Sequence, residues 1–188
     1  MQLELLNDRF LLRPLEMGDL DIVIKMFTYP DVVRYLFDVL TTQEIEDDLV
    51  ANIKRGGGGC IGVWCIVDRI SGEKMGTGAL LPLPIDEDDT NWELLEGSEL
   101  PDADIEVGYI LKRDAWGKGI ATEVCRRLLQ IAFEETPLDE IVACISEENK
   151  ASRNVLNKCE FEYLGFQKAY AELCPVFRMK RETWLEST

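Results

Sequence analysis

Apolar and polar positions recur along this chain with two different periods, and each period predicts one kind of element. Alternation at every second residue indicates strands, and apolar residues spaced by three or four indicate helices. Strands are expected at residues 9–15, 62–70, 74–83, 104–111, 140–145, 163–170 and 175–184. Helices are expected at residues 18–28, 41–55, 119–134 and 150–158, with a short helical turn or loop at 32–39. The expected order is strand, two helices, three strands, helix, strand, helix and two strands, with no internal repeat and no second domain.

Three of the expected strands carry information beyond the period of their apolar residues. Residues 140–145 are almost all apolar, which is typical of a central strand covered on both faces. In the strand at 104–111, the odd-numbered residues from 105 share one face, and Glu106 shares the other with Gly108 and Ile110. Gly76 and Gly78 suggest a β-bulge in the strand at 74–83.

Helix starts and a glycine run mark the boundaries between elements. Thr41 or Thr42 is placed to cap the helix that begins there, and Asn149 is placed to cap the helix at 150–158. The glycine run at 56–59 is followed by Cys60 rather than by Lys and Ser or Thr, so it is not a Walker phosphate loop. We expect it to be a flexible linker.

Residues 116–123 follow a strand, open a helix and contain two glycines. Gly117 and Gly119 allow a sharp turn and a close approach of a ligand to the backbone. The helix start exposes unpaired N–H groups and the positive end of the helix dipole, and Lys118 adds a charge. The segment is either a site for an anion such as phosphate or an ordinary strand-to-helix turn. It matches neither a Walker loop nor a Rossmann fingerprint, because Thr122 stands where the third glycine is needed.

Length and charge limit the classes of partner. The chain has 188 residues, which suits one domain, and a formal net charge of −16. That charge argues against a general nucleic-acid binder and against docking on anionic membranes, and it favours cationic partners. No segment is long and apolar enough to span a bilayer, and residues 1–13 lack the apolar core of a signal peptide.

Residues 85–100 form a strongly acidic segment. Acids occupy positions 86–89, 93, 96 and 99, and the segment contains neither lysine nor arginine. It is expected to be either a mobile, solvated surface loop or an acidic lip that draws in a cationic substrate.

Six cysteines and the absence of histidine constrain the chemistry. The cysteines are Cys60, Cys65, Cys125, Cys144, Cys159 and Cys174, and none forms a Cys-x-x-Cys pair. We expect free core thiols in a reducing cytosol and no metal, because a zinc site would need an unusual ligand set. Without histidine, a Cys–His pair and a Ser–His–Asp triad are excluded.

Four strings in this order resemble the GNAT (Gcn5-related N-acetyltransferase) family, and within it the RimJ/RimL-type branch. They lie at residues 10–15 (FLLRPL), 106–109 (EVGY), 117–123 (GKGIATE) and 149–158 (NKASRNVLNK), and the similarity covers nearly the whole chain. Two positions depart from the family pattern. Trp116 stands where glutamine or arginine is usual, which we expect to be tolerated because the backbone does most of the phosphate binding. Glu160 replaces a turn glycine, so the exit of that helix is expected to differ slightly.

The resemblance implies a single GNAT domain over residues 1–188 with an α+β (α/β layered) fold. Its sheet is mixed, mostly antiparallel and six- to seven-stranded, splayed between strands 4 and 5 and flanked by about four helices. The implied co-substrate is acetyl-CoA, wedged between the splayed strands. Its pyrophosphate is expected on Trp116, Gly117, Lys118, Gly119, Ile120, Ala121 and Thr122. Its pantetheine arm is expected along Tyr109, Ile110 and Leu111, with Asn149 and Ser152 on the opposite side.

The chemistry implied by the resemblance is direct attack of a primary amine on the thioester, whose carbonyl a backbone N–H near Tyr109 polarises. Since histidine is absent, a carboxylate or a water chain must accept the proton of the amine. Glu106 is the candidate base, or else only a surface strand residue. Ser152 either donates a hydrogen bond to the leaving thiolate or bonds back to its own helix. Tyr109 either orients the acetyl group or simply packs.

The resemblance does not select one class of acceptor. Protein N-terminal amines, polyamines, amino sugars and other small amines are all cationic before deprotonation, and the acidic charge does not choose among them. The alternatives are a non-catalytic acyl-CoA-binding sensor or interaction module, and a nucleotide-binding protein of another fold. We expect a cytoplasmic monomer or homodimer. A C-terminal strand edge with Val176, Phe177, Met179 and Trp184 either pairs with a second copy or packs.

Overall fold

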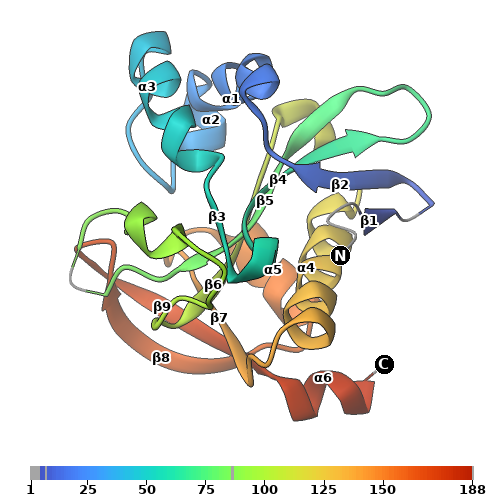
Figure 1. Ribbon diagram of the computed structural model, residues 1–188, viewed down its shortest axis with the longest axis vertical. Helices are drawn as coiled ribbons and strands as arrows, with labels where there is room; N and C mark the ends of the chain where they lie inside the picture. The colour runs from blue at the N-terminus through green and yellow to red at the C-terminus, as the bar shows by residue number, and fades with distance from the viewer. Residues whose placement is uncertain (1–4, 7, 86, 188) are drawn as a thin grey trace.

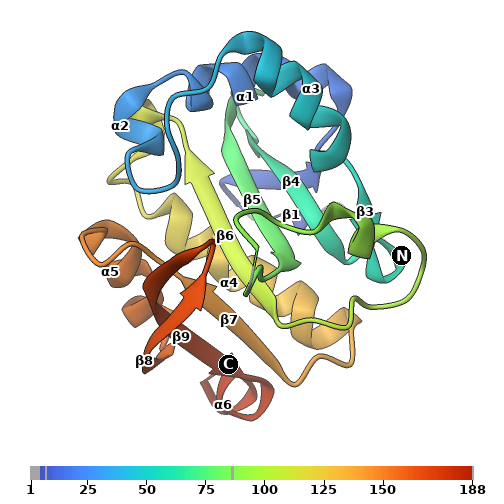
Figure 2. The same ribbon diagram turned by 90° about the vertical axis from the view of Figure 1, so that its left-hand side faces the viewer.

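The computed structural model describes residues 5–6, 8–85 and 87–187, and one twisted sheet forms its centre (Figures 1 and 2). The strands follow the order β1-β2-β4-β5-β6-β7-β9-β8, with β3 paired to β4. Their bounds are β1 (Leu5–Leu6), β2 (Phe10–Pro14), β3 (Arg55–Gly56), β4 (Ile61–Asp68), β5 (Lys74–Pro82), β6 (Ile105–Leu111), β7 (Glu140–Cys144), β8 (Glu162–Ala169) and β9 (Glu172–Lys180). Among these pairs β6 and β7 are parallel, and the others are antiparallel.

Helices cover both faces of this sheet. Their bounds are α1 (Leu20–Phe27), α2 (Pro30–Val33), α3 (Thr42–Asn52), α4 (Ile120–Glu135), α5 (Lys150–Lys158) and α6 (Arg181–Ser187). Short 3-10 turns are η1 (Met17–Asp19), η2 (Gly57–Gly59), η3 (Trp92–Leu95) and η4 (Arg113–Ala115). Figure 2 shows α1, α2 and α3 gathered along one side of the molecule and α4 behind the strands. The mixed, mostly antiparallel sheet and flanking helices predicted from the sequence are confirmed.

The sheet separates two apolar cores. Trp64 of β4 and Leu128 of α4 belong to the larger core, and the neighbouring Cys65 belongs to the smaller core with Met26 of α1 and Leu49 of α3. Successive side chains of a strand point to opposite faces, so β4 contributes to both cores. The central position predicted for residues 140–145 is confirmed, since β7 lies between β6 and β9 and buries Ile141, Val142 and Ala143.

Strands β6 and β7 part almost as soon as they meet. They share one ladder pair, Glu106 with Val142, whereas β6 pairs with β5 along its whole length. When the two-residue strands β1 and β3 are set aside, β6 and β7 are the fourth and fifth strands. The splay predicted between strands 4 and 5 is therefore confirmed, and it begins directly after Glu106.

The helix caps and the β-bulge that were predicted from neighbouring residues are present in the structure. Thr41 caps α3 through a reciprocal capping box with Glu44, and Asn149 caps α5 by accepting a hydrogen bond from the Ser152 N–H at 3.0 Å. The bulge predicted near Gly76 is present, since the register of β4 against β5 shifts opposite Met75. These features depend on residues within one or two turns of chain, which is why the sequence alone could show them.

The expected exit of α5 is corrected. Glu160 has a φ of +62°, the left-handed conformation that glycine usually supplies. The N–H of Phe161 donates to the carbonyl of Leu156 at 3.1 Å, and the N–H of Glu160 donates to that of Asn157 at 3.1 Å. This is the Schellman pattern, so the helix leaves as it would through a glycine.

The prediction of a strand up to residue 184 is wrong at its end. Strand β9 stops at Lys180, and α6 follows, with the ring of Trp184 centred 5.6 Å from that of Phe133 on α4. Strand β9 also lies between β7 and β8, so Val176, Phe177 and Met179 are buried and do not form an edge. At this end of the sheet the edge strand is β8.

The glycine run is not a flexible linker. Gly56 belongs to β3, and residues 57–59 form the turn η2, where the Gly57 N–H donates to the Glu99 carbonyl at 2.9 Å. Lys54 pairs with Glu96 at 2.9 Å, and Leu95 is buried. These contacts anchor the far end of the acidic segment to the glycine run, while its described acidic side chains stay exposed on the surface. Asp86, at its head, lies outside the described residues.

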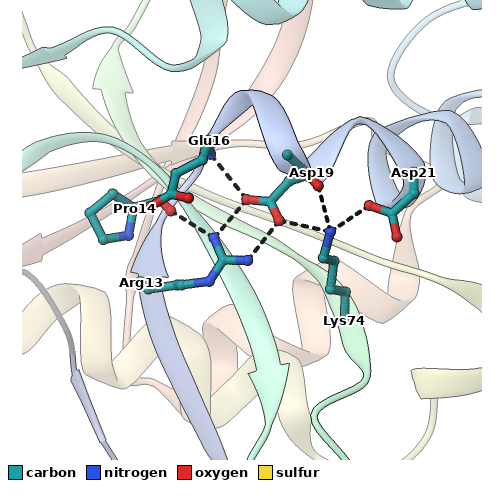
Figure 3. A network of polar contacts seen from close by, with 7 residues as sticks. Arg13, Pro14, Glu16, Asp19, Asp21 and Lys74 are labelled. Carbon is teal, nitrogen blue, oxygen red and sulfur yellow. Dashed lines mark hydrogen bonds and ion pairs between the residues drawn. The ribbon is translucent and has the colours of Figure 1, made fainter.

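A buried carboxylate ties the start of α1 to the sheet (Figure 3). Asp19, which is 1% exposed, accepts two hydrogen bonds from Arg13 of β2 at 2.6 and 2.7 Å and lies 3.0 Å from Lys74 of β5. It also accepts the N–H of Glu16 at 3.0 Å. Burial alone raises the pKa of Asp19, but the hydrogen bonds from Arg13 and Lys74 outweigh it and lower the pKa to about 2.

No helix in the described part of the chain is long and apolar enough to cross a membrane.

Candidate active site

The predicted anion-binding turn joins β6 to α4. Gly117 and Gly119 have φ values of +70° and +78°, a left-handed conformation that costs an L-residue energy and glycine little. Gly119 is the N-cap of α4, and it has no side chain with which to cover the N–H groups of Ile120, Ala121 and Thr122. A Cβ built on Gly117 meets nothing within 4 Å. The backbone N–H groups at this helix start are therefore not covered by a side-chain cap, which is the arrangement found at anion sites on helix N-termini.

Two side chains hold this turn in place. The indole N–H of Trp116 donates to the Leu111 carbonyl at the end of β6 at 2.7 Å, and the Arg113 guanidinium lies 4.6 Å from the centre of the indole ring. Arg9 donates to the Lys118 carbonyl at 2.9 Å and pairs with Glu123 in the first turn of α4. Trp116 thus has a structural role in the turn, and Arg9 is a residue that the sequence analysis missed.

Tyr109 and Ser152 meet across the splay. The hydroxyl of Tyr109 on β6 lies 2.9 Å from the Ser152 hydroxyl on α5. The Ser152 side chain therefore faces β6. Its hydroxyl contacts Tyr109, which differs from the alternative expectation that it bonds back to its own helix. Burial raises the pKa of Tyr109, so its phenol stays protonated at neutral pH. The Asn149 side-chain oxygen is occupied as the α5 cap, which leaves its NH₂ group for other partners.

Glu106 is buried, which excludes the reading of a surface strand residue. It is 7% exposed and sits at the one pair that joins β6 to β7. Burial and the nearby Cys174 thiol raise the pKa of Glu106 to about 8, although a hydrogen bond from the Cys144 backbone acts in the other direction. The phenol of Tyr170 donates a hydrogen bond to Glu106 Oε1. A carboxyl group of this kind can exchange a proton near neutral pH.

The predicted residues fall into two groups on opposite faces of β6. Since side chains alternate along a strand, Glu106 and Ile110 point to one face, and Tyr109 and Leu111 point to the other. The structure brings Tyr109 to Ser152, and it places Glu106 among residues of β7 and of the β8–β9 hairpin.

All six cysteines are free thiols, as predicted. Four are buried, and Cys144 and Cys174 are half-buried on the neighbouring strands β7 and β9 beside Glu106, where the Cys174 side chain raises the pKa of Cys144. The sequence gives no sign of this proximity, because the two residues come from different strands. Within the described ranges, no group of three or more Cys, Asp or Glu side chains stands close enough to hold a metal ion.

Comparisons with known proteins agree with this geometry. The family model described as "Acetyltransferase (GNAT) domain" matches residues 9–162. An uncharacterized N-acetyltransferase, p20, of Bacillus licheniformis is 27% identical over 187 residues, which cover 95% of this chain and 97% of that protein. A GNAT-family acetyltransferase from Bacillus anthracis has the same fold, with a TM-score of 0.73 at 17% identity over 95% of this chain and 99% of that chain.

A third similar protein is the spermidine N-acetyltransferase of Vibrio cholerae, solved in complex with CoA and spermine. It has a TM-score of 0.70 at 17% identity, over 95% of this chain and 99% of that chain. The family match and the relatives favour an enzyme over a non-catalytic acyl-CoA-binding module and over a nucleotide-binding protein of another fold. With its splayed strands and its open glycine turn, this chain belongs to the GNAT family of acetyltransferases.

Proposed function

We propose that this acetyltransferase uses acetyl-CoA to acetylate a primary amine on a cationic acceptor. The acceptor classes are a protein N-terminus, as in the RimJ/RimL-type branch, a polyamine or another small amine. A net charge of −16 supports a cationic acceptor, because it raises the local concentration of positively charged molecules. The Vibrio cholerae enzyme of the same fold, which was solved with CoA and spermine, supports both the CoA and the amine.

One observation carries this proposal: the strands part directly after a buried carboxyl group with a pKa of about 8. Beyond that point the β7-facing side of β6 has no ladder partner on β7 in the described residues, so its backbone groups are available to pair with an extended ligand. The same strand leads into the glycine turn before α4, which suits the diphosphate of CoA. The residues for binding and for proton transfer therefore lie along one strand.

Bound acetyl-CoA supplies the activated acyl group, and the side chains handle the protons. The acceptor arrives as an ammonium ion, so it must lose a proton before its nitrogen can bond to the acyl carbon. Glu106 accepts that proton; with a pKa of about 8, about one tenth of it is ionised at pH 7. As the C–N bond forms and the C–S bond breaks, the nitrogen would lose its second proton to the leaving thiolate, which thereby becomes the free thiol. The hydroxyl pair of Ser152 and Tyr109, 2.9 Å apart, would donate a hydrogen bond to that sulfur.

The test is thiol release from acetyl-CoA against a panel of amines, with the parent and Glu106→Gln side by side. The panel holds peptides beginning with Ala, Ser or Met, spermidine, an aminoglycoside and free amino acids. We expect turnover with one class, kcat/KM rising with pH toward about 8, and a loss of about 10²-fold or more in the variant.

A measurement of thermal stability and a matched control substitution show whether a loss of activity in Glu106→Gln reflects unfolding. The pKa of Glu106 is higher in the folded protein than its ordinary value of 4.5, so its ionisation costs stability as the pH rises from about 4.5 to 8. Glu106→Gln removes that cost and should unfold at the parental temperature or above it at pH 8. Glu46→Gln, on an exposed position of α3, should change neither activity nor stability. A fully active Glu106→Gln would refute Glu106 as the base, and an absence of turnover with every amine would refute the proposed reaction.

A further inference from the structure

The hairpin that joins β8 to β9 turns through two residues in an unfavourable conformation. Ala169 pairs with Glu172, so Tyr170 and Ala171 form the whole loop, and their φ values are +52° and +57°. Two positive φ values in a two-residue hairpin are those of a type I′ turn, which strongly prefers Asn-Gly. Neither residue here is glycine or asparagine. Strain of this kind tends to persist where it serves a functional site.

The strained turn places the phenol of Tyr170 against the carboxylate of Glu106. The two residues are 64 positions apart in the sequence, and the Tyr170 hydroxyl donates to Glu106 Oε1. The phenol cannot reach this carboxylate unless the turn stands in a fixed place relative to β6.

Backbone and side-chain contacts fix that place. The N–H of Tyr170 donates to the Pro84 carbonyl at 3.0 Å, and the N–H of Ala171 donates to the Glu87 carbonyl at 3.1 Å. Tyr170 also packs against the small apolar cluster of Leu83, Val142 and Ala169. The turn is therefore clamped to the segment that follows β5, on the same face of the sheet as Glu106.

The groups that act on Glu106 come from three elements. The Cys174 thiol of β9 opposes its charge, the Cys144 backbone N–H of β7 favours its charge, and the Tyr170 phenol donates from the turn. The Cys144 thiol also faces Glu106. A donor that bonds to a carboxylate stabilises the charged form. Tyr170 therefore works against the burial that favours the protonated form.

We propose that Tyr170 is a positioning residue for Glu106: its O–H fixes the orientation of the carboxylate and favours its charged form, and the strained turn is retained to hold the phenol there. This inference rests on the proposed role of Glu106 as the base. It assigns a function to a residue that lies outside every motif shared with the family, in the loop of the last hairpin.

The first variant is Tyr170→Phe, which keeps the ring and removes the donor. Without the donor, the charged carboxylate loses stabilisation, so the acid limb of the kcat/KM profile should move up by on the order of one pH unit. Activity at pH 7 should fall by on the order of tenfold and recover partly at higher pH. Tyr163→Phe makes the same change in β8, where the ring packs on Phe177, and should leave the profile at the parental position.

Two further variants separate the phenol from the fold of the turn. Ala171→Gly relaxes the strain and keeps the phenol, so it should raise Tm by about 2 °C and retain the parental profile. Tyr170→Asn combined with Ala171→Gly builds the favoured I′ sequence without the phenol. That double variant should be at least as stable as the parent and should show the same raised acid limb as Tyr170→Phe.

A direct titration makes the outcome independent of turnover. The side-chain carboxyl ¹³C resonance of Glu106, assigned by its absence in Glu106→Gln, should titrate near pH 8 in the parent and about one pH unit higher in Tyr170→Phe. An unchanged titration in Tyr170→Phe and in the double variant overturns the inference, whether or not the enzyme turns over. A shifted titration without turnover of any amine supports the positioning role and refutes the proposed reaction.

Discussion

Replacing Asp19 by asparagine tests how the fold holds α1 against the sheet. The change keeps the shape of the side chain and one acceptor oxygen, but it replaces the other oxygen by an NH₂ donor and removes the charge that Arg13 and Lys74 share (Figure 3). Those two cations then lie close together without their common anion. Because Asp19 is 1% exposed, water cannot take its place.

The size of the effect follows from the pKa. Its fall from the ordinary value of 3.8 to about 2 corresponds to about 2 kcal/mol of stability at neutral pH. Removing one partner of a buried ion pair costs about 3 to 5 kcal/mol, but Arg13 and Lys74 are each about one fifth exposed and can recover some hydration. We therefore expect a loss of about 2 to 3 kcal/mol, which lowers Tm by about 5 to 10 °C in a chain of this length.

The pH dependence gives a sharper signature. A carboxyl whose folded pKa lies below its unfolded pKa contributes stability that is fully present above about pH 4 and is lost as the pH falls through about 2. The parent should lose this contribution across that window, and Asp19→Asn should have nothing to lose there. The difference in stability between the two proteins should therefore shrink between about pH 4 and pH 2.

The assay is urea unfolding followed by circular dichroism from pH 7 down to the lowest pH at which the parent folds. Asp21→Asn is the matched control, since Asp21 also contacts Lys74, at 2.5 Å, but its side chain is 70% exposed. An exposed ion pair contributes little, so the control should stay within about 0.5 kcal/mol of the parent. The reasoning is refuted if Asp19→Asn is as stable as Asp21→Asn, or if its difference from the parent is the same at every pH.

Three further predictions concern the sheet, the turn and the charge. Gly76→Ala should give an insoluble or strongly destabilised protein in thermal unfolding, because its Cβ would lie 2.2 Å from the Ile110 carbonyl oxygen. Trp116→Phe removes the indole hydrogen bond to Leu111 and should weaken CoA binding in calorimetry by about 1 kcal/mol, with little change in Tm. For a cationic acceptor, KM should rise about two- to fivefold when the NaCl concentration increases from about 50 to 300 mM, because salt screens the attraction by the net charge of −16. The KM for acetyl-CoA should not follow the same trend. Equal acceptor KM values at the two NaCl concentrations would contradict electrostatic attraction.

Features that depend on neighbouring residues could be predicted from the sequence. A cap needs only a side chain and the N–H two or three residues on, so Asn149 could be assigned directly and the cap of α3 could be narrowed to Thr41 or Thr42. The left-handed conformation of Gly117 and Gly119 is local in the same sense. The absence of histidine is a property of composition, and it directed attention to a carboxylate base.

Features that depend on which strands lie side by side required the folded chain. Strand β9 mixes apolar and polar residues, a pattern that both an edge strand and an interior strand can show, so its position between β7 and β8 could not be inferred from its residues. The burial of Glu106 and its contact with Tyr170 arise because the β8–β9 hairpin reaches back to β6 across 64 residues. Local sequence sets backbone conformation, but the environment of a buried charge is set by distant elements that pack around it, and that environment determines its proton affinity.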